Sequence, residues 1–232
     1  MDVELYLRDP ADLLQRRDWY AEFGELLAIE ELANPEWSPT RLLYLVDGKI
    51  DFAIGGLASF GAHRYSRPFR VLIDKDNRAE DLHSASRPRQ REPPSEEKYE
   101  ECVNWFAAAA LMQAKLIVRD EPWAAKHRDW DLKRQLLRMI VWDHRCRYGW
   151  DYDTWYGGTH INEWADADIR EELNACWAGF RPAEMVPALR ASMDLFQRLA
   201  DRTARALDLS TFHHGRVRSE VDRILRTAQA SE

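Results

Sequence analysis

The stretch RLLYLVDGKIDFAI (residues 41–54) places two short apolar runs on either side of Asp47-Gly48. An Asp-Gly pair between apolar runs is a strong signal for a tight β-hairpin turn. On the second strand Ile50, Phe52 and Ile54 share one face, because successive side chains of a strand point to opposite sides. Asp51 therefore lies on the other face, although strands are depleted in aspartate. The pattern alone favours a water-facing carboxylate, and the alternative is a metal-binding or catalytic carboxylate with partners elsewhere.

The chain has 232 residues, which suffices for one large domain or two small ones, each with a core. A hydrophobic content of 45% with 10 Trp, 8 Tyr and 8 Phe indicates a globular protein. The net charge of -7 argues against nucleic acid as the main partner. Residues 1–56 carry 12 acidic and 5 basic side chains. Such a surface suits a divalent metal or a cationic substrate, and solubility alone also explains it.

The cysteines Cys102, Cys146 and Cys176 are widely spaced and form no CxxC pair, which favours reduced thiols in the cytosol. Met1 is followed directly by DVELYLRD, so we expect no signal peptide. No apolar run approaches the roughly 18 residues that a membrane span needs. We therefore expect a soluble, cytoplasmic protein that does not enter a membrane.

The first part of the chain reads as a small sheet with helical segments. Strands are predicted at 2–7, 25–30, in the hairpin that ends at Gly55-Gly56, and at 69–73. Asp2 lies on the polar face of the first strand. Residues 10–23 are predicted to be wholly or partly helical, with Asp9 and Pro10 as cap and first-turn residues. A loop is expected at 34–39.

Residues 77–98 are polar, charged and proline-containing, which predicts a linker. Its basic residues Arg87, Arg89 and Arg91 are interpreted as solvated rather than as a phosphate site. From Tyr99 onward apolar residues recur at helical spacing, with helices expected around 99–116, 130–141, 160–178, 185–207 and 216–228. The predicted fold class is α+β, with a small mixed-sheet domain at 1–92 and an all-α bundle at 93–232.

Asp2 and Asp51 both lie on polar strand faces of the predicted sheet. Neighbouring strands are about 4.8 Å apart, so carboxylates on them can share one divalent cation. Phosphoryl and nucleotidyl transfer use such an arrangement, because Mg²⁺ bridges the triphosphate and a nearby carboxylate accepts the hydroxyl proton. Spacing alone is a weak signal for this chemistry.

Several motifs in order resemble those of the aminoglycoside 6-adenylyltransferases, the streptomycin-resistance branch of the nucleotidyltransferase superfamily. Asp2–Leu7 is similar to the strand with the family's Asp-x-Asp metal motif, and VDGKIDF (46–52) to its DGxxID hairpin. The other similar segments are WYAEFGELL (19–27), VLIDKDN (71–77), Asn104, Phe106, Lys115, LLRMIVW (136–142) and LFQRLA (195–200). Each is short, but their order and spacing together are fairly specific.

The resemblance implies AMP transfer from ATP to a hydroxyl of a streptomycin-like aminoglycoside, with Mg²⁺, as an antibiotic-resistance activity. It implies that Asp2 and Asp51 are the carboxylates of the metal site and that Asp51 is also a candidate general base for the sugar hydroxyl. Lys75, between Asp74 and Asp76, is a candidate phosphate contact, although this turn is at least as well explained as structural. Asn104 and Lys115 fall on family positions.

The chain also departs from the family pattern. The family's Gly-Ser-Arg phosphate loop and the first Asp of its metal pair have no counterpart, because the sequence begins at Met1. Trp105 stands where the family has Glu. The resemblance therefore implies a nucleotidyltransferase domain that is incomplete at its N-terminus, and a truncated sheet edge would permit self-association. Two alternatives stay open: transfer to another small hydroxylated acceptor, or an inactive homologue that binds a small molecule or a protein.

Weaker candidates remain in the helical half. Acidic residues that would suit an ammonium- or guanidinium-bearing substrate are Glu100, Glu101, Glu163, Asp166 and Asp168, each of which is more simply a surface residue. His160, His213 and His214 are interpreted as surface histidines rather than metal ligands. Tyr152, Trp155 and Tyr156 are interpreted as core packing rather than as a stacking platform for a base or sugar.

Overall fold

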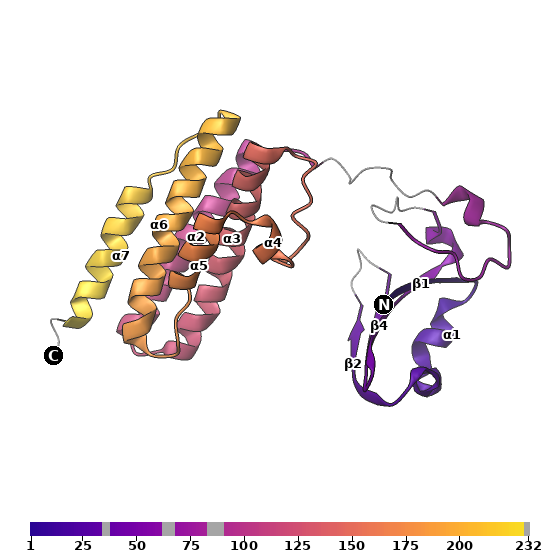
Figure 1. Cartoon of the computed structure of the whole chain (residues 1–232). Coiled ribbons are helices and arrows are strands. Elements are labelled where there is room, and N and C mark those ends of the chain that lie inside the picture. The colour runs from indigo at the N-terminus through magenta and orange to yellow at the C-terminus, as the bar shows by residue number, and fades with distance from the viewer. Residues whose placement is uncertain (34–37, 62–67, 83–90, 230–232) are drawn as a thin grey trace. The chain divides into compact units, whose positions relative to one another are not determined.

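The computed structural model divides into two compact units, residues 1–86 and 87–232, which are described separately below (Figure 1). It describes residues 1–33, 38–61, 68–82 and 91–229. Arg87, Arg89 and most of the loop expected at 34–39 lie outside these ranges. The domain assignment 1–92 and 93–232 remains a prediction.

The first unit is built on a four-stranded mixed sheet. Its strands are β1 (Asp2–Leu7), β2 (Leu26–Leu32), β3 (Thr40–Leu45) and β4 (Gly48–Gly56). They lie in the order β1-β4-β3-β2; β1 runs parallel to β4, and the other two pairs are antiparallel. The mixed sheet, together with the helical second unit, confirms the predicted α+β class.

The hairpin between β3 and β4 turns one residue earlier than expected. Leu45 pairs with Gly48, so the two turn residues are Val46 and Asp47 rather than Asp47-Gly48. Gly48 has a φ of +149°, which side-chain-bearing residues rarely adopt. The glycine is therefore needed directly after the turn, where the chain re-enters the sheet.

One face of the sheet is covered by α1 (Pro10–Gln15) and a 3₁₀ helix (Asp18–Phe23), which confirms the helical expectation for this segment. The Asp9 side chain accepts a hydrogen bond from the backbone N–H of Ala11, and Pro10 begins the helix, as predicted. The small core on this face consists of Trp19, Tyr20, Leu43, Phe52 and Ile54. Burial of the Leu43, Phe52 and Ile54 side chains contributes about 1.5–3 kcal/mol each.

The strand predicted at 69–73 is wrong. Residues 68–74 have no regular secondary structure, and Leu72 and Ile73 are 69% and 77% exposed. A short apolar run becomes a strand only where a neighbouring strand pairs with its backbone, and no described residue does so here.

The second unit is a helical bundle, as predicted. Its helices are α2 (Glu96–Val118), α3 (Pro122–Tyr148), α4 (Ile161–Trp164), α5 (Ala167–Ala175), α6 (Pro182–Leu207) and α7 (His214–Gln229). Figure 1 shows the four long helices α2, α3, α6 and α7 side by side. The rings of Phe106 on α2 and Phe196 on α6 stack in the core, with their centroids 3.7 Å apart. Within the described residues, no helix is both long and apolar enough to cross a membrane.

Candidate active site

The sheet places Asp2 and Asp51 next to each other. The two residues are register partners on the parallel strands β1 and β4. Register partners on parallel neighbours point to the same face, about 4.8 Å apart along the hydrogen-bonding direction. A backbone hydrogen bond of 2.9 Å from Asp51 to the Met1 carbonyl fixes this register. The two carboxylates that the sequence analysis paired therefore share the sheet face opposite the small core.

The Asp51 side chain is 28% exposed and has two unlike oxygens. Its Oδ2 lies 2.9 Å from Nζ of Lys49, and this hydrogen bond raises the pKa of the lysine. Its Oδ1 is buried and accepts no hydrogen bond from any described residue. Asp2, by contrast, is exposed. Asp51 is thus neither a purely solvated carboxylate nor a fully satisfied one.

The residues of this face fit a divalent metal in part. Among the described residues, no group of three or more His, Cys, Asp and Glu is arranged to hold a metal ion. Mg²⁺, however, is commonly bound by one or two carboxylates, with substrate phosphates and waters as the remaining ligands. The exposed carboxylate of Asp2 and the partly exposed carboxylate of Asp51 leave this capacity open. The pair therefore fits a metal that arrives with a phosphate-bearing substrate.

The Asp74-Lys75-Asp76 turn has mainly structural contacts. Asp74 accepts hydrogen bonds from the backbone N–H groups of Arg78 (3.1 Å) and Ala79 (2.8 Å), which lower its pKa. Asp76 pairs with Arg8, directly after β1, at 3.0 Å. Lys75 is exposed, and a phosphate contact by this residue remains a prediction.

In the second unit, Glu100, Glu101, Asn104 and Lys115 are all exposed on α2. Asn104 donates a hydrogen bond of 2.8 Å to the Glu100 carbonyl, and Glu101 pairs with Arg138 at 3.1 Å. Helical spacing places Asn104 and Lys115 three turns apart on one face of α2. These contacts do not test a role in substrate binding.

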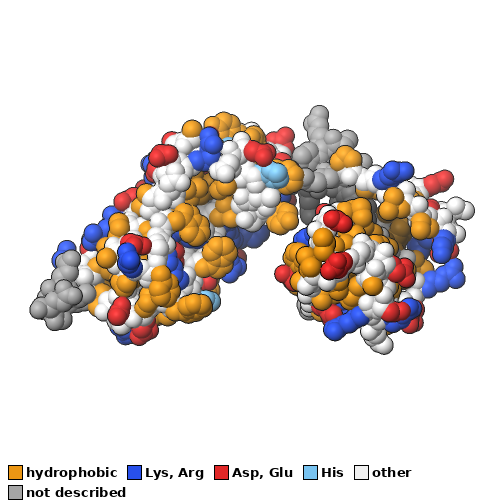
Figure 2. All heavy atoms as spheres, turned by 60° about the horizontal axis from the view of Figure 1, so that its bottom comes forward, with side chains coloured by type: hydrophobic (Ala, Val, Ile, Leu, Met, Phe, Trp, Pro, Cys, Tyr) orange, Lys and Arg blue, Asp and Glu red, His pale blue; other side chains and the backbone are white. Residues whose placement is uncertain are grey.

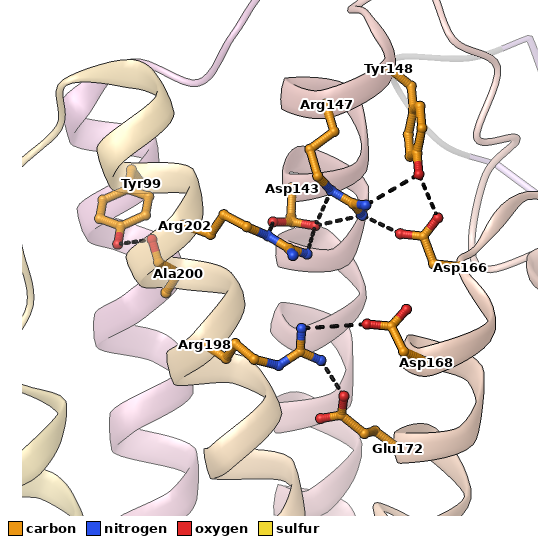
Figure 3. Close-up of polar contacts among 10 residues, drawn as sticks. All are labelled: Tyr99, Asp143, Arg147, Tyr148, Asp166, Asp168, Glu172, Arg198, Ala200 and Arg202. Atoms are coloured by element: carbon orange, nitrogen blue, oxygen red, sulfur yellow. Dashed lines mark hydrogen bonds and ion pairs between the residues drawn. The ribbon is translucent and has the colours of Figure 1, made fainter.

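The acidic residues farther along the bundle are engaged in ion pairs rather than free to bind a cation. Figure 3 shows Asp166 between Arg147 and the Tyr148 hydroxyl, which donates to it at 2.9 Å. Arg198 contacts both Asp168 and Glu172. Glu163 lies 2.8 Å from Nδ1 of His160. Glu163 and Asp168 are exposed, as expected of surface residues, whereas the side chain of Asp166 is only 21% exposed.

Sequence reasoning missed Asp143, the most deeply buried carboxylate of this network (Figure 3). Its fully buried side chain pairs with Arg147 on its own helix and with Arg202 on α6. The Asp143–Arg147 spacing of four residues on one helix was a detectable signal. The Arg202 contact joins two helices that are distant in sequence, so spacing could not reveal it.

The histidines and aromatics of the bundle have mixed environments. His160 and His213 are exposed, as expected, whereas His214 is half-buried and not a surface histidine. His144 is buried among the rings of Tyr148, Tyr152 and Trp164. Trp155 packs against the bundle core, whereas Tyr152 and Tyr156 are exposed, so the core interpretation holds for Trp155 alone of the three. Figure 2 shows hydrophobic side chains exposed among charged ones over the helices.

Comparison with known proteins gives three findings. A family model described as streptomycin adenylyltransferase matches residues 1–218. An aminoglycoside 6-adenylyltransferase of Staphylococcus aureus is 26% identical over 175 residues, which are 70% of this chain and 62% of that protein. The chain thus spans less than two thirds of that relative's length. The crystal structure of an aminoglycoside 6-adenyltransferase from Bacillus subtilis has the same fold at 16% sequence identity, with a TM-score of 0.55. The match covers 96% of this chain and 87% of that one.

Proposed function

Because the chain belongs to the streptomycin adenylyltransferase family, we propose that it transfers AMP from ATP to a hydroxyl group of an aminoglycoside in a magnesium-dependent reaction. The observation that carries the proposal is the register pairing of Asp2 and Asp51 on one sheet face. Two adjacent carboxylates, one exposed and one partly exposed, fit a metal–triphosphate complex, because Mg²⁺ is commonly bound by one or two carboxylates and substrate phosphates.

Each residue has a distinct role in this proposal. Asp2 and Asp51 hold the metal, and Asp51 also accepts the proton of the attacking hydroxyl as general base. Magnesium, when bound, supplies neutralisation of the charge on the triphosphate. Lys75, in the middle of the Asp74–Asp76 turn, contacts a phosphate. The hydroxyl oxygen then bonds to the α-phosphorus of ATP, and pyrophosphate leaves.

The acceptor in this proposal is a streptomycin-like polycation. The 12 acidic residues among positions 1–56 would attract such a cation to the sheet-bearing unit. Glu100, Glu101, Asn104 and Lys115 on α2 are proposed acceptor-binding residues, and 1–92 and 93–232 are the two proposed domains. A resistance activity of this kind acts on cytoplasmic antibiotic.

One observation favours a second candidate, an inactive homologue that binds a small molecule or a protein. Asp2 and Asp51 have no third acid or His within reach among the described residues, and Lys49 already neutralises Asp51. A two-carboxylate site with a resident ammonium would bind metal weakly. A measurement of AMP transfer therefore distinguishes the enzyme from the binding module.

The direct test is transfer of labelled AMP from ATP by the full chain with Mg²⁺ and streptomycin. Wild type is compared with Asp51→Asn and with Asp47→Asn, which changes an exposed carboxylate in the turn of the same hairpin. Transfer by wild type and Asp47→Asn, lost in Asp51→Asn, is expected. No transfer by wild type, with streptomycin bound in calorimetry, would instead establish the binding module.

A further inference from the structure

Lys49 lies two residues before Asp51 on β4, so both side chains point to the same sheet face. Its Nζ is 2.9 Å from Oδ2 of Asp51 and 5.4 Å from the ring centroid of Tyr44, its register partner on β3. The carboxylate and the ring face together hold the ammonium in place.

Lys49 is also the one basic side chain that the strand register places on this face among the described strands. The other residues on the face are Asp2, Glu4, Tyr6, Ala28, Glu30, Leu32, Thr40, Leu42, Tyr44, Asp51, Ala53 and Gly55. Arg41 is on the opposite face, because its register partner is the core residue Phe52. Among the side chains of the four strands, the positive charge on this acidic face therefore comes from Lys49.

The ammonium occupies the part of Asp51 that an incoming cation would reach. Oδ1 is enclosed by protein, so the accessible oxygen of the partly exposed carboxylate is Oδ2, the oxygen that Lys49 contacts. An ammonium and a divalent metal both need this oxygen's lone pairs, and their charges repel. The two cations therefore compete for one ligand atom.

We propose that Lys49 is the resident counter-ion of Asp51 and that a divalent metal binds at Asp2 and Asp51 by displacing the Lys49 ammonium from Oδ2. Lys49 is thus a positioning residue, which acts through Asp51. The inference rests on the proposed function, since it takes this carboxylate pair as the metal site. In this arrangement Lys49 weakens the affinity of the Asp2–Asp51 pair for free metal.

The test measures Mn²⁺ binding to the full chain without nucleotide, by the electron paramagnetic resonance signal of free Mn²⁺. Lys49→Met keeps most of the aliphatic stem and removes the charge, so we expect Mn²⁺ to bind about fivefold more tightly, the scale of a partly exposed ion pair. Lys49→Gln should shift the affinity in the same direction, and Lys49→Arg should leave it near the wild-type value. A merely structural lysine would weaken binding when replaced.

Arg17→Met is the matched control. Arg17 pairs with Glu31 at 2.9 Å, the same distance as the Lys49–Asp51 pair, but Glu31 is opposite Arg41 and so lies on the other face. Its loss should not change Mn²⁺ affinity. Thermal melting and circular dichroism verify that each variant is folded.

Unchanged or weaker Mn²⁺ binding in folded Lys49→Met and Lys49→Gln would overturn the inference, as would equal tightening in Arg17→Met. The outcome is separable from that of the proposed function. AMP transfer by wild type with no tightening in the Lys49 variants removes the inference alone. Tightening without AMP transfer supports the inference and removes the proposed enzyme activity.

Discussion

Asp143 on α3 is paired with Arg202 on α6, and its Oδ2 lies 2.5 Å from the arginine Nη2 (Figure 3). The carboxylate is fully buried, and Arg147 contacts it from its own helix. Tyr148 and Arg147 extend the network to Asp166, directly before α5. One buried carboxylate therefore connects three parts of the helical unit, and its loss leaves two guanidinium groups without their shared partner.

Asp143→Asn should destabilise the helical unit by about 3 kcal/mol, because removal of one partner from a buried ion pair leaves uncompensated charge. The measurement is urea unfolding followed by circular dichroism at the helical band. Asp194→Asn is the control, since Asp194 pairs with Arg218 at 2.8 Å but is 64% exposed. It should cost less than about 1 kcal/mol. Equal effects of the two substitutions would show that the buried network contributes no special stability.

Asp2→Asn should raise the Mg²⁺ concentration needed for half-maximal AMP transfer at least tenfold, because it removes the charge of one of the two carboxylates proposed to hold the metal. Chelation of the metal should abolish transfer in wild type, and added Mg²⁺ should restore it. The assay is a metal titration at fixed ATP and acceptor. Glu4→Gln is the control, because Glu4 follows Asp2 on the same face and opposes Ala53 instead of Asp51. A normal magnesium requirement in Asp2→Asn would remove Asp2 from the metal site.

Sequence patterns predicted individual elements better than the contacts between distant ones. Alternation along residues 49–54 placed Asp51 on the correct face, because side-chain direction in a strand is a local property. The turn was misplaced by one residue, since Asp47-Gly48 fits either register and the pairing of Leu45 with Gly48 decides between them. Residues 69–73 have strand composition but lack a described pairing partner.

The candidate site shows the same division. The strand assignments of Asp2 and Asp51 were predictable, but their side-by-side placement depends on parallel pairing between segments 49 residues apart. The Lys49–Asp51 ion pair follows from spacing within one strand and was still overlooked. Arg202 could not be assigned to Asp143, because helical periodicity does not specify which helices become neighbours.

Acid should destabilise the helical unit partly through His144. This side chain is 2% exposed, and neither ring nitrogen has a hydrogen-bond partner among the described residues. Burial lowers the pKa of His144 below its usual 6.5, despite the opposing effect of nearby Asp166. The unfolded chain therefore binds this proton more readily than the folded one. The stability that neutral His144 contributes is fully present above pH 6.5 and is lost as the pH falls below that value.

His144→Phe keeps an aromatic ring and removes the titrating group, so its free energy of unfolding should fall less than that of wild type between pH 7 and pH 5. Urea unfolding at a series of pH values measures this difference. The pKa of His214 is also lowered by burial, which leaves part of the wild-type slope in the variant. His127→Gln, at an exposed histidine of α3, is the control for the loss of a histidine elsewhere in the helical unit. Parallel pH profiles for wild type and His144→Phe would rule out this role.

Alanine substitutions at Gly48 and Gly215 should change stability in opposite directions. An added Cβ would meet no atom within 4 Å at either position, so only the backbone distinguishes the two glycines. Gly48 has a φ of +149°, and alanine there should destabilise the sheet-bearing unit by about 1–3 kcal/mol through backbone strain. Gly215 lies in α7 without a positive φ, and alanine there should stabilise the helical unit by about 0.4–1 kcal/mol. Amide hydrogen exchange read separately for β3–β4 and for α7 measures both effects, and a stabilised hairpin in Gly48→Ala would contradict the assigned turn geometry.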